Sequence, residues 1–257
     1  MGSREEVVLS ILYTNAILSV RSSQLLNADR IRRMIAAPNE RMASEVLYEC
    51  GWNIEGADII EVERKRTIRE FIELCPSEIL RDIIVAKSEF VMEGIQEYYD
   101  GQFVRLGKLK NRAITNYFVA EVDLLNLRTF AKLRLVGGKP EGMFIGGGQI
   151  AERDALTLFE RKPEGIKTSL AHLGYGALLE TLVEGLNNGD LAEFENASLT
   201  YLVELSKQGA EDSFRLNMLF HWFVAKSEEL RIVKTILTGK KFGKSRDELR
   251  EELRGVI

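Results

Sequence analysis

The stretch that decides the fold is YFVAEVDLLNLRTFAKLRL, which runs from Tyr117 to Leu135. A similar stretch, LFHWFVAKSEELRIVKTIL, runs from Leu219 to Leu237. When the two are placed in register, three pairs of polar residues coincide: Asp123 with Lys226, Asn126 with Glu229, and Arg128 with Arg231. A pattern that recurs in this way indicates one structural module used more than once. The repeat therefore favours a scaffold over an enzyme.

Both stretches are predicted helices with little polar surface, which is typical of helices that are mostly buried. At about 100° per residue, one polar pair falls within the apolar surface of each helix: Asp123 with Asn126, and Lys226 with Glu229. Burying an isolated charge is costly, so each group needs a partner. One interpretation is a local pair, or a long side chain that reaches water. The other is that partners come from other modules and fix how helices cross or where another subunit docks.

The remaining segments are also predicted to be helical, because prolines are few and long stretches avoid glycine. Asn27 is expected to cap a helix at Arg30–Ala36. Pro76 is expected to precede a helix that continues to about Tyr99, where Asp100-Gly101 ends it. Further helices are expected at residues 5–23, 40–50, 61–73, 111–135, 150–159, 167–186, 190–207, 211–238 and 245–254.

The expected fold class is therefore all-α, because no convincing alternating strand pattern is present. The residues Ile59-Ile60 fit a short strand, although a helix that extends past Glu61 is favoured. Two regions are expected, an N-terminal helical module at residues 1–110 and a helical region at 111–257 that contains the repeats at 117–135 and 219–237.

Composition excludes several classes of function. Of the residues, 45% are hydrophobic and 29% are charged, which is ordinary for a globular protein, and the net charge of −4 gives no reason to expect nucleic acid. Two histidines and the cysteines Cys50 and Cys75, without close spacing, make a zinc site an unfavoured interpretation; both thiols are expected to be buried and reduced. No apolar run approaches the ~20 residues of a membrane span. Glu5 and Glu6 do not fit a signal peptide.

Candidate catalytic groups are sparse. His172 and His221 lie far apart, and neither has a carboxylate at helical spacing, so a hydrolase is a minor hypothesis that a polar pocket near His172 would support. The run at residues 146–148 is three glycines without the Gly-Lys-Ser/Thr ending of a phosphate loop, so we expect a turn. The mixed charges of residues 61–66 are interpreted as an exposed helix face.

Two basic stretches are left open as solvated loops or as docking patches for an acidic partner. The first is RLGKLKNR at Arg105–Arg112. The second comprises Lys240, Lys241, Lys244 and Arg246, and follows Gly239, which we expect to cap the C-terminus of the second repeated helix.

These residues also resemble a family. Asp123-x-x-Asn126-Leu127-Arg128 resembles the Asp-x-x-Asn-Ile-Lys/Arg pattern of the C subunit of V/A-type rotary ATPases, whose vacuolar counterpart is the d subunit. The segment from Lys226 through Gly239-Lys240 is similar to the family's closing motif, with Glu229 before Leu230-Arg231 where the family usually has asparagine. Tyr13-Thr14-Asn15-Ala16 resembles its opening helix, although Ile17 replaces an arginine. The turn at residues 146–150 also matches, and the motifs occur in family order.

The resemblance implies a funnel of pseudo-symmetric helical modules, three in the family, of which one is expected to be shortened here. It implies a non-catalytic central-stalk subunit of an ATPase or ATP synthase that binds no nucleotide or cofactor. Its expected partners are the central-shaft subunits and the membrane rotor ring, between which it transmits torque during ion or proton transport. It would be cytoplasmic and peripheral to the membrane. The alternative is a free-standing helical-repeat adaptor with a peptide-binding groove.

Overall fold

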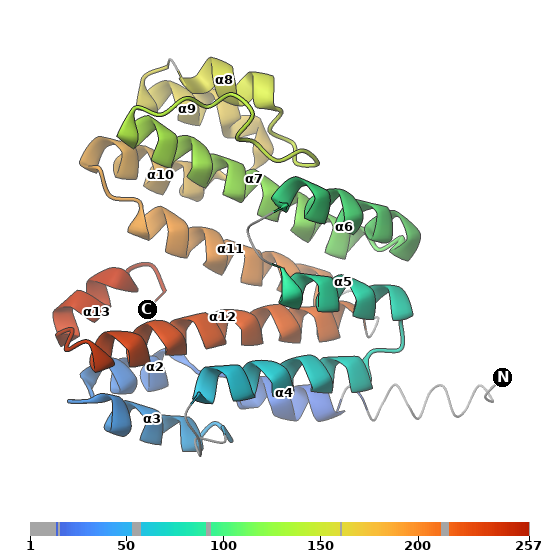
Figure 1. Cartoon of the computed structure of the whole chain (residues 1–257), viewed down its shortest axis with the longest axis vertical. Helices are drawn as coiled ribbons and strands as arrows, with labels where there is room; N and C mark the ends of the chain where they lie inside the picture. The colour runs from blue at the N-terminus through green and yellow to red at the C-terminus, as the bar shows by residue number, and fades with distance from the viewer. Residues whose placement is uncertain are drawn as a thin grey trace. The chain divides into compact units, whose positions relative to one another are not determined.

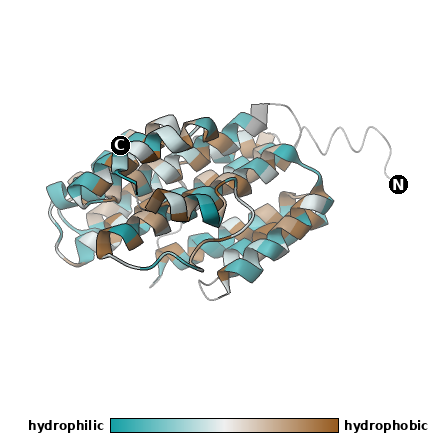
Figure 2. Cartoon of the chain, turned by 90° about the horizontal axis from the view of Figure 1, so that it is seen from above, coloured by the Kyte–Doolittle hydropathy of each residue, from teal (hydrophilic) through white to brown (hydrophobic). Residues whose placement is uncertain are grey.

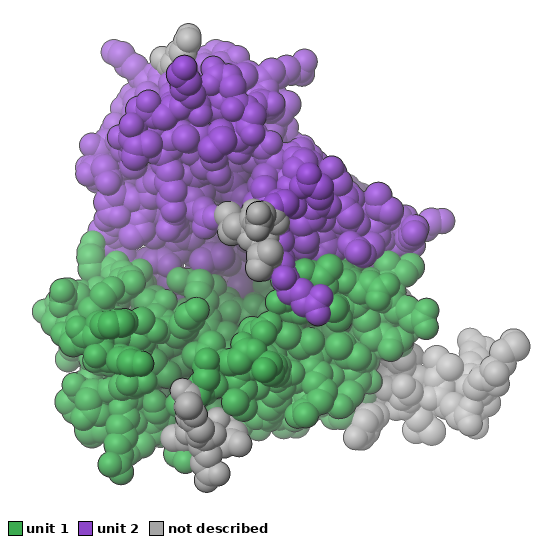
Figure 3. Space-filling model, viewed as in Figure 1, with its two compact units in different colours: residues 1–88, 206–253, 257 green, residues 89–205, 254–256 purple. Residues whose placement is uncertain are grey.

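The computed structural model describes residues 14, 16–52, 58–90, 94–159, 161–211 and 216–256. Within these ranges every secondary-structure element is a helix and no residue forms a strand (Figure 1), which confirms the all-α prediction. The helices carry both hydrophobic and hydrophilic residues (Figure 2), as is typical of partly buried helices. Two compact units are present (Figure 3), one formed by residues 1–88 and 206–253, the other by 89–205 and 254–256.

The first unit is centred on one long helix, α12 (Leu216–Lys241), which packs on α4 (Ile59–Leu74) and α3 (Glu40–Tyr48). Helix α2 (Ala28–Ala36) packs on α3 and on α13 (Arg246–Glu252). Residues 16–23 are helical as well, and α5 begins at Glu78 and ends at Glu89. Leu47, Phe71, Val233 and Ile236 are fully buried and lie in the core of this unit.

The second unit is built around α7 (Arg112–Val136), which contacts α6 (Ile95–Leu109), α8 (Glu152–Phe159) and α10 (Gly176–Asn188). Helix α9 (Pro163–Leu170) and the short 3-10 helix η1 (Ala171–Leu173) follow α8, and α9 packs on α10. Helix α11 spans Ala192–Glu211, and its residues up to Leu205 belong to this unit. Phe118, Val122, Ala131 and Leu179 form part of its core.

Local sequence signals set many helix ends. The Asn27 side chain accepts a hydrogen bond from the Arg30 N–H and caps α2, as predicted. Asn111 caps α7 in the same way by accepting from Ile114, and Gly137 ends α7 in the left-handed region at φ 67°. The residues Ile59 and Ile60 begin α4, so the favoured helix is correct and the short strand is wrong.

Several predicted helix boundaries are wrong. The helix expected from Pro76 to Tyr99 is two helices, because α5 ends at Glu89 and α6 starts after Gly94, which has φ 76°. Asp100-Gly101 lies inside α6 and does not end it, since the buried neighbours Tyr99 and Gln102 hold the segment in the helix. Propensity is a weak signal when tertiary contacts oppose it.

Glycines explain two further differences. The helix expected at 167–186 is interrupted at Gly174, which adopts φ 79°, so α9 and η1 precede the separate helix α10. Gly239 is not the cap of α12 but an interior residue, and Gly243 with φ 76° follows the helix end. A Cβ on Gly239 would lie 2.5 Å from Leu249 Cδ2, so this glycine allows α13 to approach α12 closely.

The domains at 1–110 and 111–257, the pseudo-symmetric modules and the funnel stay predictions.

Candidate functional site

The polar pair of α7 is buried and bound to segments outside the helix. Asn126 and Ile145 exchange two hydrogen bonds: the Asn126 Nδ2 donates to the Ile145 carbonyl at 2.8 Å, and the Ile145 N–H donates to Asn126 Oδ1 at 2.8 Å. Asp123 Oδ1 accepts from the Ile150 N–H at 2.9 Å, and Oδ2 accepts from the Tyr175 hydroxyl at 2.8 Å. The two side chains therefore fix the loop that joins α7 to α8, and Asp123 also holds Tyr175 next to α10.

Two of the three glycines of that loop allow its backbone to approach α7 and α6 closely. A Cβ on Gly148 would lie 2.3 Å from Asp123 Oδ1, and one on Gly147, which has φ 99°, would lie 2.2 Å from the Phe103 ring. The run is a turn between helices, as predicted. Gly147 and Gly148 are needed because the backbone at these two positions lies directly against the side chains of Phe103 and Asp123.

Burial dominates the electrostatics around Asp123. Loss of solvent raises the pKa of Asp123 above its ordinary value, although the hydrogen bonds from Ile150 and Tyr175 act in the opposite direction. The pKa of Tyr175 is also raised, first by burial and then by the charge of Asp123. A carboxylate that receives a phenolic hydrogen bond in a dry interior is a structural group unless a substrate can reach it.

The polar pair of α12 lies in a network of buried charges. Lys226 Nζ is 2.5 Å from Glu229 Oε1 and 3.0 Å from Glu63 Oε1, and all three residues are less than 10% exposed. Glu229 Oε1 also accepts from Trp52 Nε1 at 3.0 Å, and Oε2 accepts from the Leu26 N–H at 2.8 Å. The ammonium of Lys226 lies 4.4 Å from the centre of the Trp52 ring, a cation–π contact.

The two pairs share one feature. The second polar residue of each helix accepts a hydrogen bond from the backbone N–H of a non-helical segment, Ile145 for Asn126 and Leu26 for Glu229. Of the two sequence interpretations, the local pair applies to Lys226 and Glu229, which also have partners on other elements. In α7 the hydrogen bonds of Asp123 and Asn126 reach residues outside the helix.

The arginines of the repeat are placed differently. Arg128 is half-buried and forms no ion pair within the described part of the chain, whereas Arg231 pairs with Glu228 through two hydrogen bonds of 2.6 and 2.8 Å. A role of these six repeat residues in binding another subunit stays a prediction.

Sequence reasoning missed the partners of both pairs. Glu63 was assigned to an exposed charged face, and this is wrong: it is buried, with Thr67 and Phe71 one and two turns further on. Residues four positions apart lie on the same face of a helix, and here that face packs on α12. The spacing was therefore a signal in the sequence that Glu63 is buried. The contributions of Tyr175 and Ile145 have no comparable local signal, because their contacts depend on how the chain returns to α7.

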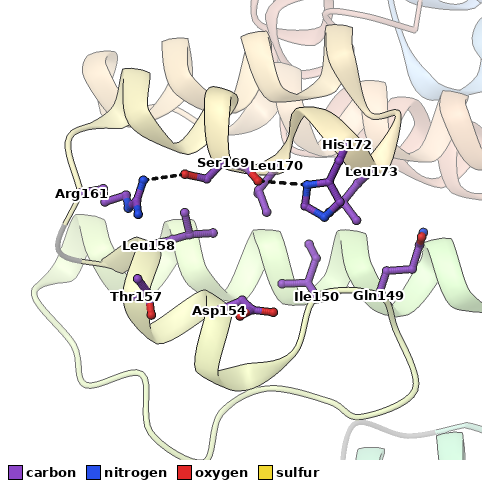
Figure 4. Close-up of a pocket in the computed structure, with 10 residues that line it drawn as sticks. All are labelled: Gln149, Ile150, Asp154, Thr157, Leu158, Arg161, Ser169, Leu170, His172 and Leu173. Atoms are coloured by element: carbon purple, nitrogen blue, oxygen red, sulfur yellow. Dashed lines mark hydrogen bonds between the residues drawn. The ribbon is translucent and has the colours of Figure 1, made fainter.

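A pocket of about 270 Å³ lies between α8 and α9 and includes His172 in its lining (Figure 4). Leu158 and Leu170 are buried beneath it, and Arg161 and His172 lie toward opposite ends. The Nδ1 of His172 lies 3.1 Å from the carbonyl oxygen of Ser169, while the Ser169 hydroxyl donates to Gly165 and accepts from Arg161. The contacts of His172 and Ser169 therefore do not form a nucleophile–base pair.

The other histidine does contact a hydroxyl. Ser206 Oγ and His221 Nδ1 are 2.9 Å apart, across α11 and α12. Ser206 is only 5% exposed. A nucleophile must be reached by its substrate, so this contact is explained as packing between helices.

Both cysteines are buried and free, as expected. In the described residues, no cluster of three or more His, Cys, Asp or Glu side chains could hold a metal ion. No helix in those same ranges has the length and apolar character needed to cross a membrane.

The fold and the two polar pairs together define a class of protein. It is a helical scaffold in which buried polar side chains of long helices form hydrogen bonds with loops. The family model described as the ATP synthase (C/AC39) subunit matches residues 39–252, most of the 257-residue chain. The chain therefore belongs to the ATP synthase C/AC39 subunit family.

Two relatives illustrate the similarity. The C subunit of the A-type ATP synthase of Halorubrum lacusprofundi is 28% identical over 141 residues, which cover 53% of this chain and 40% of the relative. The C subunit of the V-type ATP synthase of Thermus thermophilus is 29% identical over 148 residues, which cover 56% and 43%. The aligned part thus spans about two-fifths of the length of these relatives.

Proposed function

We propose that this chain is a non-catalytic central-stalk subunit of a V/A-type ATPase or ATP synthase. It links the membrane rotor ring to the central shaft and transmits torque between them during ion transport. The observation that carries the proposal is the family match over residues 39–252. The names of the Halorubrum and Thermus relatives, which are C subunits of A-type and V-type ATP synthases, support it.

Mechanical coupling needs elements that keep their shape under load. Helices α7 and α12 suit this role because they are long, deeply packed and tied to other segments by buried hydrogen bonds. Close-packed interiors transmit strain instead of absorbing it. The proposal includes pseudo-symmetric modules around an opening that receives the shaft, and a location on the cytoplasmic side as a peripheral component.

The proposal is tested by reconstitution with the central-shaft subunits and the rotor ring purified from the same organism. The chain is expected to bind both and to restore ATP-driven ion pumping to a complex from which it has been removed. ATP hydrolysis by the catalytic part alone should not require it. A chain that binds neither component, or that leaves pumping unrestored, contradicts the proposal.

A further inference from the structure

The turn between α6 and α7 carries a basic groove that the proposed function does not explain. Phe103, Leu106 and Gly107 of α6 line it on one side, together with Lys110, which directly follows the helix. Asn111, Arg112 and Thr115 of the α7 start line the other side. The groove has a volume of about 380 Å³.

The groove has an apolar floor, and the space above Gly107 contains no other atoms of the described part of the protein. Leu106, which lines the groove, is buried. A Cβ on Gly107 would meet no atom within 4 Å, so the glycine leaves the groove open. A space of this kind can receive an apolar side chain of another molecule.

The charged residues that line the groove, Lys110 and Arg112, are both positive. Lys108, Lys110 and Arg112 are exposed, and none of them forms an ion pair with a described residue. The sequence between Asp100 and Glu121 contains no acidic residue, although the whole chain has a net charge of −4. The positive charge of this turn is therefore local and not a property of the whole surface.

Two of these cations occupy positions that the local backbone disfavours. Lys110 has φ 54°, and among the described residues it is the only one other than glycine with a positive φ. A lysine in the left-handed region costs energy that glycine or asparagine would avoid, and such strain is concentrated at functional positions. Arg112 is the first residue of α7, where the helix dipole favours acidic side chains. Local stability therefore does not explain either cation.

We propose that this groove docks an acidic segment of a neighbouring subunit of the rotary complex, with one apolar side chain placed between its carboxylates. The inference rests on the proposed function and adds to it the chemistry of one contact. The concave apolar floor favours a protein segment over a membrane, because a lipid surface offers no single side chain to fill such a space.

The test measures binding of the full chain to the purified shaft subunits and to the purified rotor ring, at low and at physiological salt. The main variant is Lys110→Gly/Arg112→Gln, and its matched control is Lys139→Gln/Lys162→Gln, which removes two exposed cations of the same unit. The main variant is expected to bind one component about tenfold more weakly, with a smaller salt dependence. Its thermal stability should equal or exceed that of the wild type, because the left-handed lysine is gone.

A second variant tests the shape of the groove. Gly107→Leu should fill the space and block binding while the protein remains folded, and Gly107→Ala should bind like the wild type. Equal binding by wild type, Lys110→Gly/Arg112→Gln and Gly107→Leu would overturn the inference but leave the proposed function intact. A wild type that binds neither component overturns both. Binding through this turn to vesicles of equal parts phosphatidylcholine and phosphatidylglycerol, with binding to the shaft and ring unchanged, would also refute it.

Discussion

Asn126 and Ile145 exchange hydrogen bonds as two paired strand residues do, although one is a side chain of α7 and the other lies in a loop. The amide of asparagine presents a donor and an acceptor in the same geometry as a peptide group. It thereby satisfies both backbone groups of Ile145, which is itself buried. Few other side chains of this length offer both a hydrogen-bond donor and an acceptor, so few substitutions can replace Asn126.

Replacing Asn126 with alanine should destabilise the protein by about 2 to 4 kcal/mol, because the N–H and the carbonyl of Ile145 would both lose their partner in the interior. Chemical denaturation monitored by circular dichroism measures the free energy of unfolding. The control is Asn187→Ala, an exposed position of α10, which should change stability by less than about 0.5 kcal/mol. Equal effects of the two substitutions would contradict the assigned role of the amide.

Asp123 predicts a specific pH dependence of stability. Burial raises its pKa in the folded state, so between the ordinary carboxyl pKa of about 4 and the raised value the folded protein binds more protons than the unfolded one. The free energy of unfolding must then fall as pH increases through that window, and the stabilising contribution is complete only below it. Asp123→Asn, which cannot ionise, should remove this part of the pH dependence.

The measurement is urea unfolding at a series of pH values. Asp154→Asn is the matched control, because it removes the same charge from an exposed position of the same unit. The control should keep the slope of the wild type. A wild-type stability that rises steadily with pH through this window, with no change of slope in Asp123→Asn, would show that the carboxylate is not held in a dry site.

Lys226 should be among the most sensitive positions of the first unit. Its replacement by methionine leaves Glu63 and Glu229 buried without their counter-ion, which we expect to cost about 3 to 5 kcal/mol. Lys234→Met, at an exposed position of the same helix, should be nearly neutral.

A double-mutant cycle separates this pairing from simple packing. Adding Glu63→Gln to Lys226→Met should restore about 1 kcal/mol or more, because one uncompensated charge is removed. Strictly additive effects would mean that the two charges do not interact. Thermal or urea unfolding of the four proteins supplies the comparison.

Sequence patterns give the helices, several caps and the burial of the two polar pairs, because these depend on periodicity and on nearby residues. Asn27, Asn111 and Gly137 act locally, and so they could be predicted. The helix that passes through Asp100-Gly101 could not, since the burial of Tyr99 and Gln102 outweighs the weak local preference.

The partners of the pairs were beyond local reasoning for a different reason. Asp123 and Asn126 were placed in an apolar surface, but nothing in their neighbourhood indicates that residues 145 and 150 return to them. Glu63 is an exception, because its spacing to Thr67 and Phe71 marks a buried face among surrounding charges. Giving that spacing more weight than the mixed charges would have predicted the ion pair with α12.

The three consecutive glycines at 146–148 should differ sharply in their tolerance of alanine. Gly148→Ala places a methyl group 2.3 Å from Asp123 Oδ1 and 3.1 Å from Val122 Cγ1, so we expect a loss of about 1 to 3 kcal/mol. Gly147→Ala should be at least as harmful, since its φ of 99° is unsuited to alanine and its Cβ would overlap the Phe103 ring.

Gly146→Ala is the internal control, because its nearest contact is the flexible amide of Gln96 at 3.4 Å. It should leave stability within about 0.5 kcal/mol of the wild type. Unfolding of the three variants in urea, followed by tryptophan fluorescence and by circular dichroism, measures the order. If all three glycines tolerated alanine equally, the loop would not lie against Asp123 and Phe103. The conclusion that α7 holds this loop in place would then be wrong.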